Sequence, residues 1–169
     1  KVKIMLINGK KQSGKTFFAG LLKDELEKQE KAVEVMAFAD SIKDILCISL
    51  GIDLDTFNEY KVNRTPIVIN GIKYNDVRLF IQKFGTEAMQ NAFGKTVWTD
   101  VLLKKVECSV ADYILVPDLR FKHEFIPGAL TVQIINNDLK STDNHASEVE
   151  LDGYEYEYVI DNTGKPDMT

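Results

Sequence analysis

Arginine is scarce in this chain of 169 residues. Of the 21 basic residues, only Arg64, Arg78 and Arg120 are arginines, and the formal net charge is −5. An acidic balance argues against the broad basic face of a polynucleotide-binding protein, so we expect no nucleic-acid polymer as a partner. Arginine suits bidentate phosphate recognition, and these three residues are therefore candidates for phosphate contacts. A genome rich in lysine would produce the same count.

Cysteine and long apolar runs are also scarce. Cys47 and Cys108 lie far apart in apolar helical patterns, and we interpret them as reduced core thiols. No apolar run approaches the roughly 20 residues that cross a membrane. The first residues form an expected strand without the small-residue cleavage site of a signal peptide. These absences predict a soluble, cytoplasmic protein with no membrane partner.

Strand and helix patterns alternate through most of the chain, which favours an α/β fold built on a parallel sheet. The expected strands are residues 2–7, 33–38, 113–116, 130–135 and 156–160. The expected helices include residues 16–30 and 41–50, the second of which ends at Gly51. The chain has the length of one domain, so we predict a single domain over residues 1–169.

The alternation is interrupted through about residues 52–110. The pair Asn70-Gly71 stands between alternating apolar residues, which is a strong β-hairpin signal. A helix is expected over residues 76–91, and another one ends near residue 108. We interpret this stretch as a substrate-binding region inserted into the same domain.

A phosphate-binding pattern, G-x-x-x-x-G-K-[ST], is matched at every fixed position by residues 9–16. The candidate contacts are Gly9, Lys11, Gln12, Ser13, Gly14, Lys15 and Thr16. A strand precedes the loop and a helix follows it, so backbone N–H groups and the helix dipole would favour an anion at one spot. Lys15 would reach the β- and γ-phosphates, and the Thr16 hydroxyl would ligate Mg²⁺. The motif predicts binding of a nucleoside triphosphate.

Two charged residues follow the expected strand 113–116. Asp118 could hold Mg²⁺ directly or through water, and Arg120 could span the phosphates of a donor and an acceptor. The alternative is an aspartate that caps the next turn beside an exposed arginine. Next to a phosphate-binding loop we favour the functional interpretation.

Four further residues are candidates for a second substrate. Asp40 follows the strand 33–38 at the sheet edge where open α/β folds bind ligands, although it could equally cap the next helix. Lys43, one turn later, is either a substrate contact or a solvated side chain. Arg78 and Gln82 are four residues apart and share one helix face. Such a pair can hold a phosphate and read the edge of a base, or can form a plain polar face.

Together these segments resemble the bacteriophage deoxynucleoside monophosphate kinases. The matching pieces are residues 9–16, 38–43, 78–87 with Trp98, 118–124 and 145–148. They keep their order over nearly the whole chain. The Arg-x-x-x-Gln-x-x-Gly-Thr-Glu run and the Asp-x-Arg-Phe-x-x-Glu run are much more specific together than the phosphate-binding loop alone.

The resemblance implies a three-layer P-loop kinase fold. A parallel five-stranded sheet would carry helices on both faces, with a substrate-binding insertion and a mobile lid near residues 121–128. The implied reaction transfers the γ-phosphate of ATP, with Mg²⁺, to a deoxynucleoside 5′-monophosphate. A homodimer is also plausible from the resemblance.

The resemblance also suggests roles for individual residues. Lys15, Asp118 and Arg120 would be catalytic, with Thr16 and Asp118 at the metal. The acceptor nucleotide would contact Asp40, Lys43, Arg64, Arg78, Gln82, Trp98 and Arg120. Arg64 is included because related sequences often carry an arginine where this chain has Gln90 and Asn91, and Arg64 or a lysine could substitute. The residues give no role for His145 and Glu148.

Two other classes of function share part of this pattern. One is another small-molecule P-loop kinase, such as a dephospho-coenzyme A or shikimate kinase. The other is a nucleotide-dependent switch without kinase chemistry. The run from Arg78 to Gln82 favours a nucleotide acceptor over the first class. The sequence lacks the Asn-Lys-x-Asp motif that is usual in guanine-binding switches.

Overall fold

The structure, a computed structural model, describes residues 1–139 and 146–164. The chain forms two compact units, one of Lys1–Phe38 with Leu102–Thr169 and the other of Ala39–Val101. Each unit has its own hydrophobic core. The insertion expected near residues 52–110 and the lid expected near 121–128 stay predictions.

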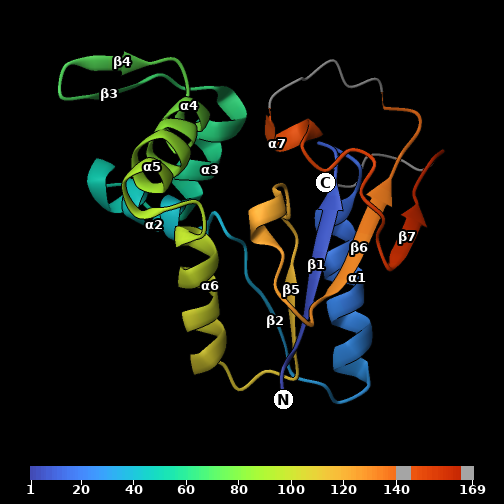
Figure 1. Ribbon diagram of the computed structural model, residues 1–169. Coiled ribbons are helices and arrows are strands. Elements are labelled where there is room, and N and C mark those ends of the chain that lie inside the picture. The colour runs from blue at the N-terminus through green and yellow to red at the C-terminus, as the bar shows by residue number, and fades with distance from the viewer. Residues whose placement is uncertain (140–145, 165–169) are drawn as a thin grey trace. The chain divides into compact units, whose positions relative to one another are not determined.

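The first unit is built on a five-stranded parallel sheet (Figure 1). Its strands are β1 (Lys3–Gly9), β2 (Val33–Val35), β5 (Tyr113–Val116), β6 (Leu130–Ile135) and β7 (Tyr158–Asp161). Their order is β2-β5-β1-β6-β7, and every neighbouring pair is parallel. Leu6 pairs with Val116 of β5 and with Thr131 of β6, so β1 is the central strand. The predicted five-stranded parallel sheet is confirmed.

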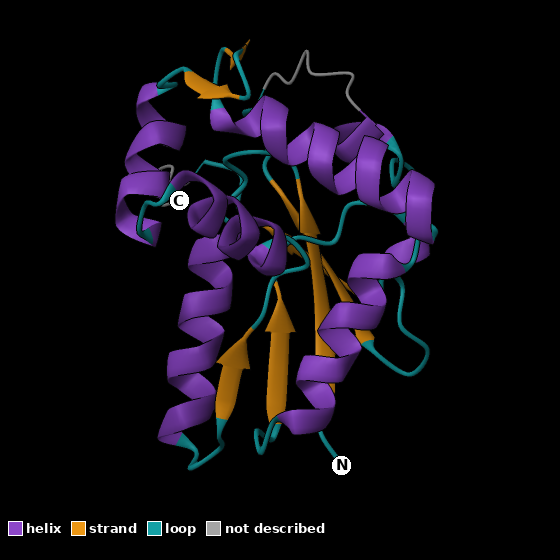
Figure 2. Cartoon of the chain, turned by 90° about the vertical axis from the view of Figure 1, so that its left-hand side faces the viewer, coloured by secondary structure: helices purple, strands orange, loops and turns teal. Residues whose placement is uncertain are grey.

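Helices cover both faces of this sheet. Successive strand residues point to opposite faces, and apolar residues on each face pack against a helix. Ile7 and Leu115 lie on the face that packs against Ala19 of helix α1 (Lys15–Lys28). Leu6 and Ile114 lie on the other face. That face is completed by Leu102 and Val106, from the second half of helix α6 (Val97–Cys108). Figure 2 shows the strands between these helices, so the predicted three-layer arrangement is confirmed.

The strand predicted at residues 33–38 is shorter than expected. It ends at Val35, and Asp118 turns the chain away from the sheet, because its Oδ1 accepts the Phe38 N–H at 2.9 Å. A short 3-10 turn, η2 (Lys122–Glu124), follows β5, and helix α7 (Ala146–Val149) precedes β7.

The second unit is mainly helical. It contains α2 (Asp40–Leu50), α3 (Leu54–Asn63), β3 (Ile67–Ile69), β4 (Ile72–Tyr74), α4 (Val77–Gln82), the π-helix η1 (Lys83–Gln90) and α5 (Asn91–Phe93). Its core is Leu46, Phe57, Ile67 and Val77. The predicted hairpin is confirmed. Asn70 and Gly71 have φ values of 50° and 76°, as the two central residues of a type I′ turn require.

One helix start and one helix interior differ from expectation. Asp40 is the first residue of α2 and Ala39 holds the cap position without a side-chain bond, so the alternative that Asp40 caps this helix is wrong. The helix expected at 76–91 exists but widens into η1. There the Gly85 carbonyl accepts the Trp98 indole N–H at 3.0 Å, and a Cβ on Gly85 would lie 2.8 Å from Ile42 Cδ1.

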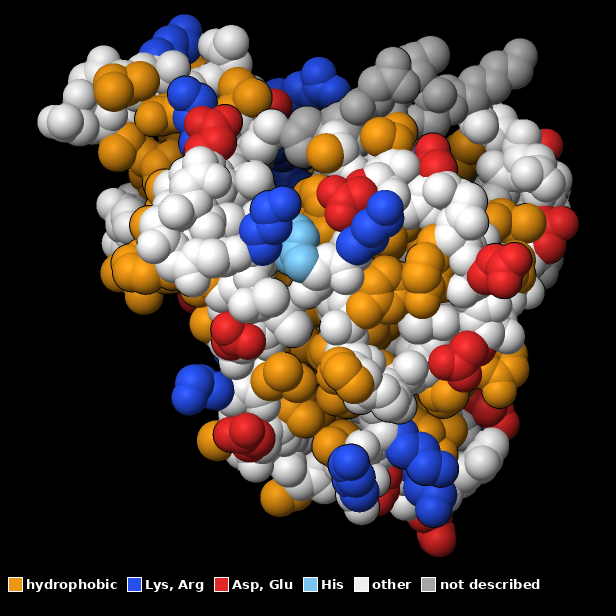
Figure 3. All heavy atoms as spheres, viewed as in Figure 1, with side chains coloured by type: hydrophobic (Ala, Val, Ile, Leu, Met, Phe, Trp, Pro, Cys, Tyr) orange, Lys and Arg blue, Asp and Glu red, His pale blue; other side chains and the backbone are white. Residues whose placement is uncertain are grey.

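The surface corrects one expectation. Both cysteines are free thiols as predicted, but Cys108 is exposed, so placing it in the core was wrong. On the face shown in Figure 3, acidic and basic side chains are interspersed among apolar ones. Within residues 1–139 and 146–164, no helix has the length and apolar character needed to cross a membrane.

Candidate active site

The loop between β1 and α1 has the geometry of an anion-binding turn. Gln12 and Gly14 have φ values of 61° and 98°, and the Ser13 N–H closes the turn on the Lys10 carbonyl at 3.1 Å. Gly14 occupies the cap position of the 14-residue helix α1, and as a glycine it supplies no side-chain cap. The first N–H groups of a helix lack internal partners, so this end of α1 favours a negative ligand.

At both fixed glycines of the loop, a larger residue would collide with a neighbouring side chain. A Cβ on Gly9 would lie 2.4 Å from Ser13 Oγ, and one on Gly14 would lie 2.6 Å from Asn162 Nδ2. Ser13 is buried, and its hydroxyl has no hydrogen-bond partner among the described residues. A buried hydroxyl without a partner is costly, which makes it a candidate contact for a bound ligand.

Lys15 lies folded over this loop. Lys15 is only 9% exposed, and its Nζ donates to the Lys10 carbonyl at 3.5 Å. Asn162, directly after β7, donates from Nδ2 to the Ser13 carbonyl at 3.0 Å. This bond ties the loop to the segment after β7. Asn162 was not among the predicted site residues, although a polar residue at the end of an expected strand was a usable signal.

Asp118 lies at the same edge of the sheet as the loop, because β5 and β1 are parallel neighbours. The segment after β5 is fastened to β1. The Leu119 N–H donates to the Ile7 carbonyl at 3.1 Å, and Asn8 Nδ2 donates to the Leu119 carbonyl at 2.7 Å. These bonds set the direction of the chain between the two predicted functional residues, Asp118 and Arg120.

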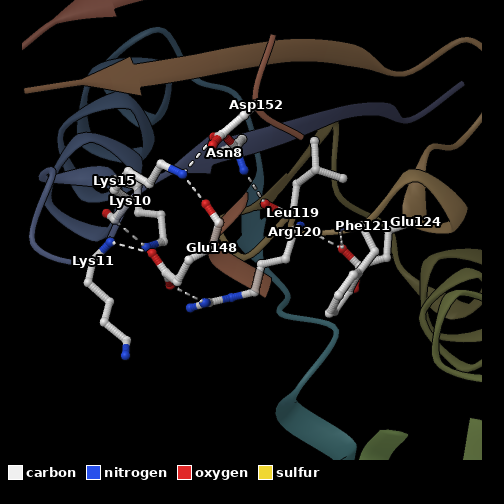
Figure 4. A network of polar contacts seen from close by, with 10 residues as sticks. All are labelled: Asn8, Lys10, Lys11, Lys15, Leu119, Arg120, Phe121, Glu124, Glu148 and Asp152. Atoms are coloured by element: carbon white, nitrogen blue, oxygen red, sulfur yellow. Dashed lines mark hydrogen bonds and ion pairs between the residues drawn. The ribbon is translucent and has the colours of Figure 1, made fainter. Parts of the chain in front are cut away.

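Arg120 is joined to the loop through a carboxylate (Figure 4). Its Nη1 lies 2.8 Å from Glu148 Oε1, and Glu148 Oε2 accepts the Lys11 backbone N–H at 3.2 Å. Lys10 Nζ donates to the Glu148 carbonyl and to Asp152 Oδ1, the latter at 2.6 Å. The structure therefore brings the loop, Arg120 and the α7 segment together. Lys10 and Asp152 were missed by sequence analysis, because nothing local marks their partners.

Glu124 fixes the backbone of Arg120. The residue is buried, and its Oε2 accepts the N–H groups of Arg120 at 2.7 Å and of Phe121 at 3.1 Å. Burial raises the pKa of this carboxyl to about 8, and the negative charge of Asp118 adds to the rise, although the two N–H donors oppose it. The last residue of the Asp-x-Arg-Phe-x-x-Glu run thus closes the turn that carries Arg120.

Replacing Glu124 by glutamine is expected to change how stability depends on pH. The folded pKa of about 8 lies above the usual value of 4.5, so the fold favours the protonated form. That stabilisation is complete below pH 4.5 and is lost as the pH rises through 8. Glutamine keeps an acceptor oxygen and does not titrate. The melting temperature of the variant minus that of the wild type should therefore be larger at pH 8 than at pH 5. The same dependence of melting temperature on pH in both proteins would contradict the raised pKa of Glu124. Glu150→Gln is the control variant.

The remaining predicted residues all lie in the second unit. They are Asp40 and Lys43 in α2, Arg64 after α3, Arg78 and Gln82 in α4, and Trp98 in α6. The Arg78 backbone N–H is held by the Asp76 side chain at 2.7 Å, which caps α4. Trp98 is 6% exposed and holds η1 through Gly85. Their roles toward a substrate stay predictions.

Metal ligation rests on few residues. Among the residues that the structure describes, no group of three or more His, Cys, Asp or Glu side chains could hold a metal ion. The candidates from sequence are Thr16, exposed in the first turn of α1, and Asp118. His145 lies outside the described residues.

Comparison with known proteins adds a family relationship. A family model described as deoxynucleotide monophosphate kinase matches residues 52–168. The chain is also 31% identical over 119 residues to a protein of Enterobacteria phage T4 described as deoxynucleotide monophosphate kinase. The match covers 65% of this chain and 49% of the phage protein, so the chain spans about half the length of that relative. Residues 9–16 lie outside the range of the family model, so the phosphate-binding loop is separate evidence.

Proposed function

Because the chain belongs to the deoxynucleotide monophosphate kinase family, we propose that it transfers the γ-phosphate of ATP to a deoxynucleoside 5′-monophosphate. One observation carries the proposal. Arg120, from the segment after β5, shares the Glu148 carboxylate with the backbone of the phosphate-binding loop. A guanidinium held beside a loop that favours anions is suited to neutralise the charge of a migrating phosphoryl group.

The proposed transfer is direct and in line. An oxygen of the acceptor phosphate attacks the γ-phosphorus, and the bond from that phosphorus to the β–γ bridging oxygen breaks, which leaves ADP and a deoxynucleoside diphosphate. The acceptor phosphate is already ionised near neutral pH, so the reaction needs no strong general base. Lys15 and Arg120 would place positive charge around the transferring group, and the N–H groups of the loop would hold the donor phosphates.

The chain offers a donor set that suits Mg²⁺. This ion usually takes one or two oxygens from the protein and the rest from water and substrate phosphates, so the Thr16 hydroxyl and the Asp118 carboxylate would suffice. Both follow the carboxyl ends of adjacent strands, β1 and β5. When bound, Mg²⁺ would neutralise phosphate charge. Asp118 also holds the Phe38 N–H, so its carboxylate is oriented by the fold.

The acceptor nucleotide is assigned to the second unit. Arg78 and Gln82 stand one helical turn apart on α4, which suits a phosphate and a base edge. Asp40, Lys43 and Arg64 would supply further polar contacts. Since the Trp98 side chain is buried, we assign it mainly to the support of η1, behind the Gly85 backbone.

Replacing Arg78 by alanine is expected to raise the KM for the monophosphate by roughly 10- to 100-fold, because a charge-assisted bond to phosphate is lost. The KM for ATP should change little. Steady-state kinetics with each substrate varied in turn would measure both constants. Lys73→Ala removes one positive charge from β4 of the same unit and serves as the control. An unchanged monophosphate KM would remove Arg78 from the acceptor site.

The test of the proposed function is an ADP-release assay with ATP and Mg²⁺. The acceptors are dAMP, dGMP, dCMP, dTMP and their ribose counterparts, with dephospho-coenzyme A and shikimate alongside. Activity with deoxynucleoside monophosphates would support the proposal and reveal which bases are accepted. Activity only with a non-nucleotide acceptor would assign another small-molecule kinase. ATP binding without activity toward any acceptor would favour a nucleotide-dependent switch.

A further inference from the structure

Glu148 is a buried carboxylate beside a loop that favours anions. Its side chain is 2% exposed, and a buried charge is costly unless it is paired and hydrogen-bonded. Among residues 1–139 and 146–164, each of its oxygens has a partner. Oε1 lies 2.8 Å from Arg120 Nη1, and Oε2 accepts the Lys11 N–H at 3.2 Å. The side chain therefore bridges the guanidinium and the backbone of the loop, as Figure 4 shows.

Arg120 is held at both ends. Glu124 accepts its backbone N–H at 2.7 Å, and Glu148 accepts its guanidinium. The Glu148 backbone is fixed as well, because its carbonyl accepts Lys10 Nζ. A long side chain that is 30% exposed would otherwise sample many rotamers in solvent. Glu124 holds the backbone of Arg120 and Glu148 holds its guanidinium, so both ends of the side chain have a fixed partner.

We propose that Glu148 is the positioning residue for Arg120. It orients the guanidinium beside the phosphate-binding loop before substrates arrive, and this role rests on the proposed phosphoryl transfer. A guanidinium carries five N–H donors, so a bond through Nη1 fixes the orientation of the group and leaves it the capacity to bind phosphate oxygens. Orientation set in advance lowers the barrier, because the chain does not reorganise during the reaction.

The charge of Glu148 gives this role a kinetic signature. A carboxylate near the loop repels the triphosphate, so removing its charge should not weaken ATP binding. Arg120 and Lys11 meet different oxygens of Glu148, and in glutamine one of these two positions becomes an NH₂ group that cannot accept a hydrogen bond. Glu148→Gln should therefore lower kcat by roughly 10- to 100-fold, while the KM for ATP stays the same or falls.

The control for this measurement is Glu150→Gln, which removes the same charge two residues later. The Glu150 carboxylate accepts the Lys122 N–H and has no bond to Arg120 or the loop among the described contacts. It should leave kcat unchanged. An unchanged or raised kcat in Glu148→Gln would overturn the proposal, since a carboxylate that merely blocked the loop would give a faster variant. An equal loss of kcat and ATP affinity would also overturn it and indicate a general structural role.

A double-mutant cycle tests whether Glu148 acts through Arg120. The proteins are the wild type, Glu148→Gln, Arg120→Lys and the double variant, all measured for kcat. Because lysine lacks the planar fork that Glu148 orients, the double variant should be as slow as Arg120→Lys alone, within about twofold. Losses that multiply would show that the two residues act independently and would overturn the proposal.

A third measurement does not depend on catalysis. The chain has only three arginines, so the side-chain ¹⁵N NMR spectrum should resolve Arg120 from Arg64 and Arg78. Glu148→Gln should lower the order parameter of the Arg120 Nε–H bond alone, and Glu150→Gln should lower none. Unchanged order at Arg120 would overturn the positioning role. If the wild type phosphorylates no deoxynucleoside monophosphate, the proposed function fails separately, and the NMR result still decides whether Glu148 orients Arg120.

Discussion

Lys15→Ala is expected to lower kcat by about 10³-fold, because the variant lacks the positive charge that the proposed mechanism places at the donor phosphates. Lys15 is 9% exposed and folds back over the loop, with its Nζ 3.5 Å from the Lys10 carbonyl. The ammonium group is therefore placed before ATP binds. ADP release under saturating substrates would measure the loss.

The control for Lys15 lies on the same helix. Lys23 is a surface residue of α1 whose Nζ lies 3.7 Å from Glu27, and Lys23→Ala should keep normal turnover. Circular dichroism should show that both variants keep their helix content, because Lys15 contributes no part of the apolar core. Normal turnover in Lys15→Ala would mean that residues 9–16 do not hold the donor phosphates.

Arg120→Gln is expected to lower kcat by about 10³-fold, as for arginines that neutralise a migrating phosphoryl group. It should also reduce stability, because Glu148 would keep a buried charge after losing its main partner. We expect a loss of about 1–3 kcal/mol in the free energy of unfolding, which denaturant titration would measure.

The two effects of Arg120→Gln can be separated. In the double variant Arg120→Gln/Glu148→Gln, the buried charge is gone, so stability should recover while kcat stays low. Recovery of both would mean that Arg120 acts only as the partner of Glu148 and takes no part in the transfer. Recovery of neither would mean that the loss of stability has another cause than the unpaired carboxylate.

Local patterns predicted the scaffold well, because they depend on periods and short motifs. The strand positions followed from apolar runs, and the hairpin followed from Asn70-Gly71, where both residues take positive φ values. The loop at residues 9–16 was identified from its sequence motif alone. Gly51 ended α2 as expected, with a φ of 65°.

The wrong predictions arose where contacts between residues far apart in the sequence override the local pattern. The strand that begins at Val33 ended early because Asp118 captures the Phe38 N–H, an interaction between residues 80 apart. The π-helical widening of η1 has no periodic signature, since it accompanies the close approach of Gly85 to Trp98 and Ile42. Cys108 fits an apolar pattern but ends its helix in solvent.

The bridge built by Glu148 was beyond sequence reasoning for the same reason. A glutamate in a polar segment gives no sign that it will be buried. Its partner Arg120 is 28 residues away and its partner Lys11 is 137 residues away. Only the parallel sheet, which gathers the carboxyl ends of β1, β5 and β6 at one edge, makes these residues neighbours.

The ties between the loop and the last part of the chain affect how the protein folds. Lys10 bonds to Glu148 and Asp152 across 138 and 142 residues, and Ser13 bonds to Asn162 across 149 residues. Contacts of such long range slow folding, because the entropy of closing the chain is lost before the contacts form. During synthesis on the ribosome, the loop would emerge first, and its bond to Asn162 could form only after residue 162 has been added. We therefore expect ATP to stabilise the finished protein and to give no protection to nascent chains that stop before β7.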